Sequence, residues 1–295
     1  MSINLNFPNL NYFNKIKNSI IDPQGKEISE ELIWLTLGGE WGNSKFPVII
    51  SGRGEPVLLI HGFDSCFLEF RRIYPILRNH FKLIIPDLLG FGFTPRLKSY
   101  KYNPENIIRN LTDLLKVLNF KNQIKLVGAS MGGSVALLLS NNIPNSIEKI
   151  IMLSPAGLFS DPKSLPVPFN QFGAMFLGSP IVRRNLCRQA FAFPNKSVGP
   201  KEEQIASIHT GCPKWRDSLA SFAKSGGFGG TYKYISDIPT KTICGENDRI
   251  LGFNELERLK EKRQLNYLNL KNCGHLPHLD LPETTGKVIL DFFNN

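Results

Sequence analysis

Short runs of aliphatic and β-branched residues alternate with longer amphipathic stretches along most of this 295-residue chain. The short runs lie at residues 46–50, 56–60, 82–85, 124–127, 149–153, 241–244 and 265–270. The stretches with helical spacing lie at 68–78, 106–118, 131–140, 254–263 and 283–293. Such alternation is typical of parallel strands joined by crossover helices, so the sequence predicts an α/β fold.

The alternation stops after Pro155 and resumes only near the end of the chain. In between, Pro, Gly and aromatic residues recur without a strand–helix pattern. The simplest architecture is one α/β core with an insertion, which a chain of this length allows. We expect a core of residues 31–157 and 236–295, an inserted segment of 158–235, and a polar, irregular lead-in of 1–30.

The charge and the cysteine content indicate which kinds of partner and which cellular compartment to expect. The formal net charge is +10, which favours anionic partners. No nucleic-acid-binding module is visible, so weak adsorption to an anionic membrane fits better than a nucleic-acid partner. The five cysteines show no CxxC spacing, which predicts reduced thiols. Without a secretory segment or a run of about 18 apolar residues, we expect an intracellular protein, soluble or peripheral on a membrane.

A G-x-S-x-G motif at residues 128–132 contains the candidate nucleophile, Ser130. An apolar strand is predicted before it and a helix after it, which is the context that a nucleophile elbow requires. The alternative is a glycine-rich turn with a solvent-facing serine. The strand–turn–helix context favours the elbow.

A serine hydroxyl needs a base to remove its proton. His275 follows the last predicted strand, which places it at the same carboxyl edge of the sheet as Ser130. His278 is the second candidate, near the entry to the final helix. Cys273 together with these two histidines resembles a metal-ligand cluster, but a fourth ligand and an H-E-x-x-H pattern are both missing from the sequence. We predict His275 as the base.

The base in turn needs a carboxylate to orient it. Asp248 follows the penultimate strand, and the order Ser130, Asp248, His275 matches that of α/β serine hydrolases. Glu246 is the nearest rival for this role. An oxyanion also needs backbone N–H donors. We expect them from Met131, which follows the nucleophile, and from Phe63 in the loop after residues 56–60.

Together these motifs resemble the α/β-hydrolases that carry a cap. They stand in that family's order at residues 61–62, 87–92, 128–132, 245–248 and 274–275. The resemblance implies a mostly parallel, eight-stranded type of sheet flanked by helices, with a mainly helical cap inserted. It also implies acyl transfer to water without a metal or organic cofactor. Ser130 differs from the dehalogenases and epoxide hydrolases of this fold, which use aspartate.

Within that family the chain is most similar to the chlorophyll dephytylases, which cleave the phytyl ester of chlorophyll. The similar segments are residues 61–66, 67–71, 223–227 and 272–278. The resemblance implies Ser130, Asp248 and His275 as nucleophile, acid and base, and a photosynthetic membrane as the location. Ala129 and Met131 differ from the Pro and Leu usual in those enzymes, and residue 66 is Cys instead of Ser.

Apolar residues in the predicted cap bear on the substrate. Phe169, Phe172 and Phe176 are expected to contact a long apolar chain, with His278 as a further contact near the base. The alternative is that these phenylalanines pack the cap on the core.

Three functions remain open from sequence. The first is a serine hydrolase of a large apolar ester such as chlorophyll. The second is a hydrolase of small soluble esters or of C–C bonds in cleaved-ring diketones. The third is a ligand receptor that retains the hydrolase fold, since fold alone does not decide function. The acyl and alcohol groups, the organelle and the oligomeric state are not predicted.

Overall fold

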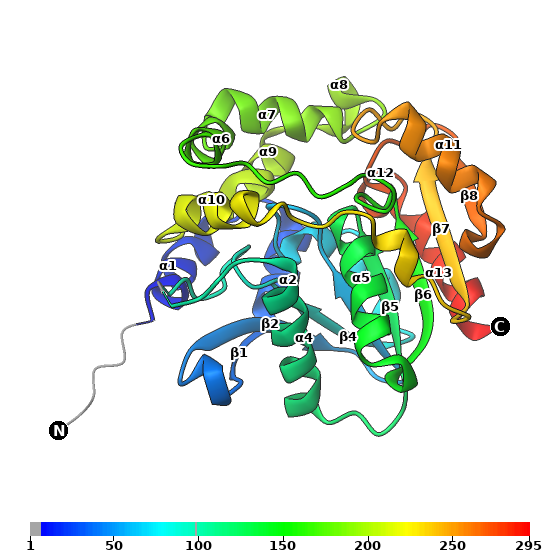
Figure 1. The fold of residues 1–295 in the computed structure, drawn as a ribbon, viewed down its shortest axis with the longest axis horizontal. Coiled ribbons are helices and arrows are strands. Elements are labelled where there is room, and N and C mark those ends of the chain that lie inside the picture. The colour runs from blue at the N-terminus through cyan, green and yellow to red at the C-terminus, as the bar shows by residue number, and fades with distance from the viewer. Residues whose placement is uncertain (1–6, 98) are drawn as a thin grey trace.

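The computed structural model describes residues 7–97 and 99–295, which form one eight-stranded sheet flanked by helices (Figure 1). The spatial order of the strands is β1-β2-β4-β3-β5-β6-β7-β8. Their bounds are Leu32–Thr36, Lys45–Ser51, Pro56–Ile60, Lys82–Pro86, Ile124–Ala129, Ile147–Leu153, Thr240–Gly245 and Tyr267–Leu270, for β1 to β8. The predicted α/β fold class is confirmed.

Six neighbouring strands run parallel, in the spatial order β4, β3, β5, β6, β7 and β8. Strand β2 pairs antiparallel with both β1 and β4. The carboxyl ends of β3, β5, β6, β7 and β8 therefore meet at one edge of the sheet. The strands expected from the sequence are confirmed, and β1 is an addition. It is a short edge strand that is only half-buried, so its residues lack the continuous apolar run that marks the central strands.

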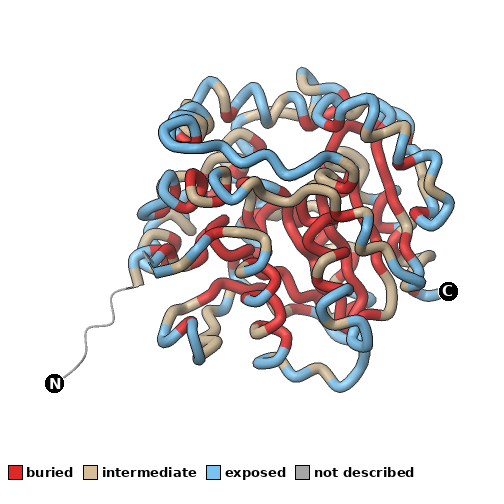
Figure 2. Tube along the Cα trace, viewed as in Figure 1, coloured by how far each residue is buried: buried red, intermediate tan, exposed pale blue. Residues whose placement is uncertain are grey.

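Both faces of the sheet are covered. Along β3, Val57 and Leu59 pack in one hydrophobic cluster, whereas Leu58 and Ile60 pack in another. This follows from the alternation of side chains along a strand. One cluster includes α4 (Pro104–Leu118) and α5 (Met131–Asn142), and the other includes α13 (Pro282–Asn294). Figure 2 shows the buried residues concentrated along the strands and the core-facing helices.

The helix expected over residues 68–78 is wrong as a continuous element. A 3-10 helix covers Phe67–Phe70, and a separate α3 covers Tyr74–Leu77. Pro75 explains the break, because proline has no N–H to donate within a helix and favours the first turn. The remaining core helices are α11 (Phe253–Glu261) and α12 (Pro277–Asp280).

The irregular lead-in expected for residues 1–30 is wrong where the structure describes it. Helix α1 covers Pro8–Ile16 and α2 covers Pro23–Glu30. Each begins with a proline, and the Asp22 carboxylate caps α2 by accepting from the Gly25 N–H at 2.9 Å. Buried apolar side chains in this segment anchor it to the core. Residues 1–6 lie outside the described part of the chain.

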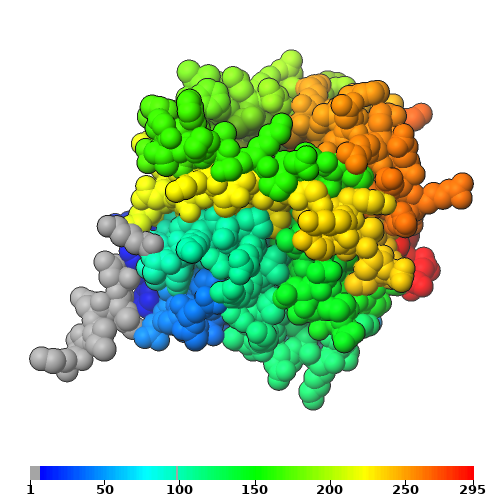
Figure 3. Space-filling view, viewed as in Figure 1, coloured from blue at the N-terminus to red at the C-terminus, as the bar shows by residue number. Residues whose placement is uncertain are grey.

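The segment between β6 and β7 contains helices and no strand among its residues, all of which are described. We call residues 158–235 the cap. Its helices are α6 (Phe169–Leu177), α7 (Pro180–Gln189), α8 (Pro194–Ser197), α9 (Pro200–Ser207) and α10 (Trp215–Ser225). Helix α6 packs on α10, and α7 packs on α9. The cap lies over the carboxyl edge of the sheet (Figures 1 and 3).

Strand β5 and helix α5 are in close backbone contact at Gly128. A Cβ added at Gly128 would lie 2.2 Å from the Gly132 carbonyl oxygen, a backbone atom that cannot rotate away. We expect Gly128→Ala to lower the free energy of unfolding by about 1–3 kcal/mol, the usual cost of overpacking. Urea denaturation measures the change. Gly252→Ala is the control, because a Cβ there meets open space. Equal unfolding midpoints for the two variants would contradict this account.

Candidate active site

Ser130 lies on a tight turn between β5 and α5. Its backbone has φ 52° and ψ −118°, a conformation that non-glycine residues rarely adopt. The Ser130 N–H donates to the Leu153 carbonyl on β6 at 2.8 Å, which holds the turn in place. This is the strand–turn–helix geometry of a nucleophile elbow, and it projects the serine side chain beyond the sheet edge.

Ser130, His275 and Asp248 form one hydrogen-bonded chain. The Ser130 Oγ lies 2.8 Å from His275 Nε2, and His275 Nδ1 lies 2.8 Å from Asp248 Oδ2. The three residues follow β5, β8 and β7, so parallel strands bring them to one edge of the sheet. The structure thus brings together the three side chains that the sequence predicted as a set. Glu246, the rival acid, is exposed to solvent.

The environment of Asp248 favours its ionised form. Burial alone would raise its pKa, but the hydrogen bond and charge of His275 lower it, as do two backbone N–H groups. Those N–H groups belong to Ile250 and Leu251, which donate to Oδ1 at 2.8 and 3.0 Å. The net pKa is below the ordinary value for aspartate. A carboxylate held ionised in this way can orient the His275 imidazole and stabilise its protonated form.

The cap is fastened to the loop that carries the histidine. The His275 backbone N–H donates to the Ala190 carbonyl at 2.8 Å. The Ala192 N–H donates to Asp280 Oδ2 at 2.8 Å, and the Ala192 carbonyl accepts from Arg249 Nη2 at 2.9 Å. Residues 190–192, between α7 and α8, are therefore bonded to the core on both sides of His275.

The loop after β3 lies against the nucleophile. A Cβ added at Gly62 would lie 3.2 Å from the Ser130 Cβ. The His61 ring holds this loop through Nδ1, 2.8 Å from the Gly62 carbonyl, and through Nε2, which accepts from the Leu88 N–H at 3.0 Å. Burial lowers the pKa of His61 to about 4, so its role is that of a neutral hydrogen-bonding group.

Two backbone N–H groups near Ser130 are free to receive an oxyanion. Within residues 7–97 and 99–295, neither Phe63 nor Met131 uses its N–H in a hydrogen bond. Met131 is the first residue of α5, where helix N–H groups have no intrahelical partner. The helix dipole adds a partial positive charge at this end. The two donors expected from the sequence are thus both available.

A cavity of about 250 Å³ opens beside Ser130 and His275. Its walls are mainly apolar and include side chains of the core and of the cap. The apolar lining residues are Phe63, Leu177, Leu186, Ala190, Ala206, Ile250 and Leu276. The charged lining residues are Asp64, Glu69 and Arg183.

The structure does not bring Phe169, Phe172 and Phe176 to this cavity, contrary to expectation. Their exposed fractions are 62%, 56% and 63%, and they lie on the outward face of α6. The opposite face of the same helix packs inward through Asn170 and Ala174. The spacing of the phenylalanines places them on one side of a helix, but it does not say which side meets the core.

His278 lies behind the cavity wall. It is fully buried, with Nε2 3.4 Å from Glu69 Oε1, and the cavity is lined by Glu69 at this place. The Gly62 N–H donates to both Glu69 oxygens at 3.3 Å, so the pair supports the loop after β3. Burial alone would raise the pKa of Glu69, but its contact with His278 lowers it below the ordinary value. Sequence reasoning missed Glu69, although a lone carboxylate within the apolar run Phe67–Phe70 is a detectable signal.

The cluster of Cys273, His275 and His278 is not arranged for metal binding. Among the described residues no group of three His, Cys, Asp or Glu side chains could hold a metal ion. Burial and nearby carboxylates raise the pKa of the Cys273 thiol to about 12, which disfavours the thiolate that a metal would need.

Comparison with known proteins agrees with this geometry. Residues 55–179 match the family model described as "alpha/beta hydrolase fold". The chain is 29% identical over 291 residues to the alpha/beta hydrolase domain-containing protein VTE7 of Arabidopsis thaliana, covering 93% of this chain and 87% of that protein. It is 38% identical over 254 residues to Lipase 1 of Psychrobacter immobilis, covering 79% of this chain and 74% of the lipase.

The fold is also similar to that of a solved serine hydrolase involved in carbazole degradation, the CarC enzyme. The TM-score is 0.74 at 21% identity, covering 89% of this chain and 98% of that chain. The resemblance drawn from the sequence motifs is confirmed at the level of the family. With its eight-stranded sheet, its serine on the turn after β5 and these relatives, the chain belongs to the alpha/beta hydrolase fold family.

Proposed function

We propose that this protein is a serine carboxylic-ester hydrolase that acts on a large apolar ester. Ser130 is the nucleophile, His275 the base and Asp248 the acid that orients it. The observation that carries the proposal is the unbroken chain of two 2.8 Å contacts from Asp248 through His275 to the Ser130 hydroxyl. The phytyl ester of chlorophyll is the substrate we propose to test first.

The reaction follows from the placement of these groups. His275 Nε2 takes the hydroxyl proton as the Ser130 Oγ attacks the ester carbonyl. The N–H groups of Phe63 and Met131 stabilise the oxyanion that forms. His275 then gives its proton to the departing alcohol, which leaves an acyl-enzyme. A water molecule, deprotonated by His275, releases the acid and restores the Ser130 hydroxyl.

The cavity favours an apolar substrate over a charged one. Its walls near Ser130 are mainly aliphatic, and burying a hydrocarbon chain there gives about 0.8 kcal/mol for each CH₂. Arg183 is the one cation that lines the cavity among the described residues, and its Nη1 and Nη2 are bonded to Asp64 and to the Ala206 carbonyl. Arg183 is therefore not free to pair with an acidic group of a substrate. This counts against the alternative of a C–C hydrolase that acts on cleaved-ring diketones with an acid group.

We propose that the outward face of α6 attaches the protein to an anionic membrane. Besides the three phenylalanines, other apolar side chains on α6 or next to it are exposed. Their exposed fractions are 57% for Val167, 55% for Met175 and 73% for Ile181. Figure 2 shows exposed residues along α6 and α7. The net charge of +10 would attract anionic lipids, while the apolar side chains enter the interface. No helix of the described residues is long and apolar enough to cross a membrane.

Ser130→Ala should abolish ester hydrolysis and leave the fold and substrate binding nearly unchanged, because the hydroxyl is used only in covalent catalysis. Purified protein is incubated with chlorophyll and with a short-chain nitrophenyl ester, and the products are resolved. A fluorophosphonate probe should label the wild type at Ser130 and miss the variant. Full activity of Ser130→Ala would exclude this mechanism. Binding of chlorophyll without turnover by the wild type would favour the receptor alternative.

His275→Ala should lose far more activity than His278→Ala, and Asp248→Asn more than Glu246→Gln. Loss of a triad member costs on the order of 10⁴-fold in kcat. Initial rates of the four variants with the same ester measure these losses. If His278→Ala and Glu246→Gln proved the more damaging pair, the assignment of the site would be wrong.

Changing Phe169, Phe172 and Phe176 together to serine should weaken binding to vesicles that contain anionic phosphatidylglycerol. Turnover of a soluble short ester should change little, because these side chains do not line the cavity. Co-sedimentation measures binding, and added salt should weaken it further. Val117→Ser is the control, since Val117 is 45% exposed on α4, away from the cap. Unchanged sedimentation of the triple variant would contradict the proposed membrane face.

A further inference from the structure

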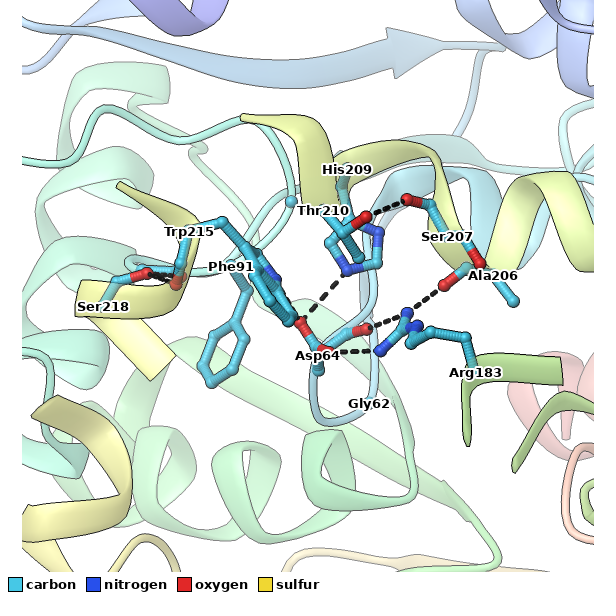
Figure 4. Close-up of polar contacts among 12 residues, drawn as sticks. Gly62, Asp64, Phe91, Arg183, Ala206, Ser207, His209, Thr210, Trp215 and Ser218 are labelled. Atoms are coloured by element: carbon cyan, nitrogen blue, oxygen red, sulfur yellow. Dashed lines mark hydrogen bonds and ion pairs between the residues drawn. The ribbon is translucent and has the colours of Figure 1, made fainter. Parts of the chain in front are cut away.

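Three cap side chains converge on one buried carboxylate in the loop after β3 (Figure 4). The carboxylate is that of Asp64. Its Oδ1 accepts from Trp215 Nε1 at 2.8 Å and lies 3.1 Å from His209 Nε2. Its Oδ2 pairs with Arg183 Nη1. The partners come from α10, from the 3-10 helix Ile208–Gly211 and from α7, so one carboxylate joins separate parts of the cap.

Burial and charge make this junction hard to separate. Asp64, Arg183 and His209 are 6%, 9% and 1% exposed. Burial alone would raise the pKa of Asp64, but its bonds to His209, Arg183 and Trp215 hold it well below the usual range. Burial lowers the pKa of His209, so a neutral imidazole faces the carboxylate. A buried carboxylate left without its cation would be strongly destabilised.

The loop after β3 is held by side-chain contacts on both sides of Phe63. His61 is held through its ring, Gly62 through the contact of its N–H with Glu69, and Asp64 through the cap. Asp64 itself has φ 48°, a left-handed conformation that is costly for a residue with a Cβ. Between these anchors, the Phe63 N–H forms no hydrogen bond with any described residue, so it is free to point toward the reacting carbonyl.

We propose that Asp64 is a positioning residue that lets the cap set the direction of the Phe63 N–H. This inference rests on the proposed ester-hydrolase function, in which that N–H stabilises the oxyanion. When the cap is seated, Arg183, His209 and Trp215 fix the carboxylate, and the loop presents its N–H to the intermediate. When the contact is broken, the loop relaxes from its left-handed turn and the donor moves. The cap thus contributes to the reaction rate as well as to substrate binding.

The test separates positioning from simple stabilisation. Asp64→Asn places an amide against the Arg183 guanidinium, and Arg183→Gln removes the cation without substituting any residue of the loop. End-point labelling with a fluorophosphonate counts the functional Ser130 sites, and kcat is expressed per labelled site. We expect each variant to label fully but to lose about 10²-fold in kcat per site, with KM within about threefold, because a displaced donor weakens only the transition state. The double variant should lose no more than the larger single loss.

Arg184→Gln is the matched control. Arg184 is the next residue on α7, but it is exposed and pairs with Glu203 on the surface, so this variant should behave like the wild type. If the activity lost in both Asp64→Asn and Arg183→Gln were accounted for by unlabelled protein, Asp64 would be only a structural anchor and the inference would be overturned. If Asp64→Asn does not fold, Arg183→Gln alone decides. A wild type that is neither labelled nor active would instead overturn the proposed function itself.

Discussion

The close approach of β3, β5 and α5 at Ser130 is the constraint on which the rest of the site depends. A Cβ on Gly132 would lie 2.1 Å from the Ile60 carbonyl oxygen, so helix and strand are in backbone contact there. This contact holds Ser130 at positive φ, starts α5 at Met131 and leaves the loop after Ile60 beside the serine. The position of Ser130 and of both free N–H groups therefore results from one packing arrangement, and the parallel sheet brings His275 and Asp248 to it.

The parts of this arrangement that the sequence predicted are those encoded locally. Ser130, Asp248 and His275 each follow a recognisable apolar strand, so their meeting at one sheet edge could be inferred from the alternation alone. The central strands could also be predicted, because burial on both faces requires continuous apolar runs. The edge strand Leu32–Thr36 is not predicted from the sequence, because it is only half-buried. The helices within residues 8–30 are not predicted either, because their few apolar contacts are with distant parts of the core.

The features that sequence reasoning missed depend on contacts between distant residues. Asp64 lies in a loop, and the partner of its carboxylate, Arg183, lies 119 positions further along the chain. Glu69 is paired with His278 across a still longer stretch of chain, and no local pattern links the two. The outward direction of Phe169, Phe172 and Phe176 is another such case. Helical spacing showed that they share a face, whereas the packing of α6 on α10 decides which way that face points.

The hydrogen bond from the His275 backbone to the Ala190 carbonyl has a consequence for how a substrate enters. Residues 190–192 are bonded to the same loop that carries the His275 imidazole, so this part of the cap cannot lift without disturbing His275. Arg183, near the start of α7, is bonded to Asp64 as well, so α7 is tied to the core near both of its ends. A substrate therefore has to enter with α7 in place, and the His275 imidazole keeps its position beside Ser130 while the cavity fills.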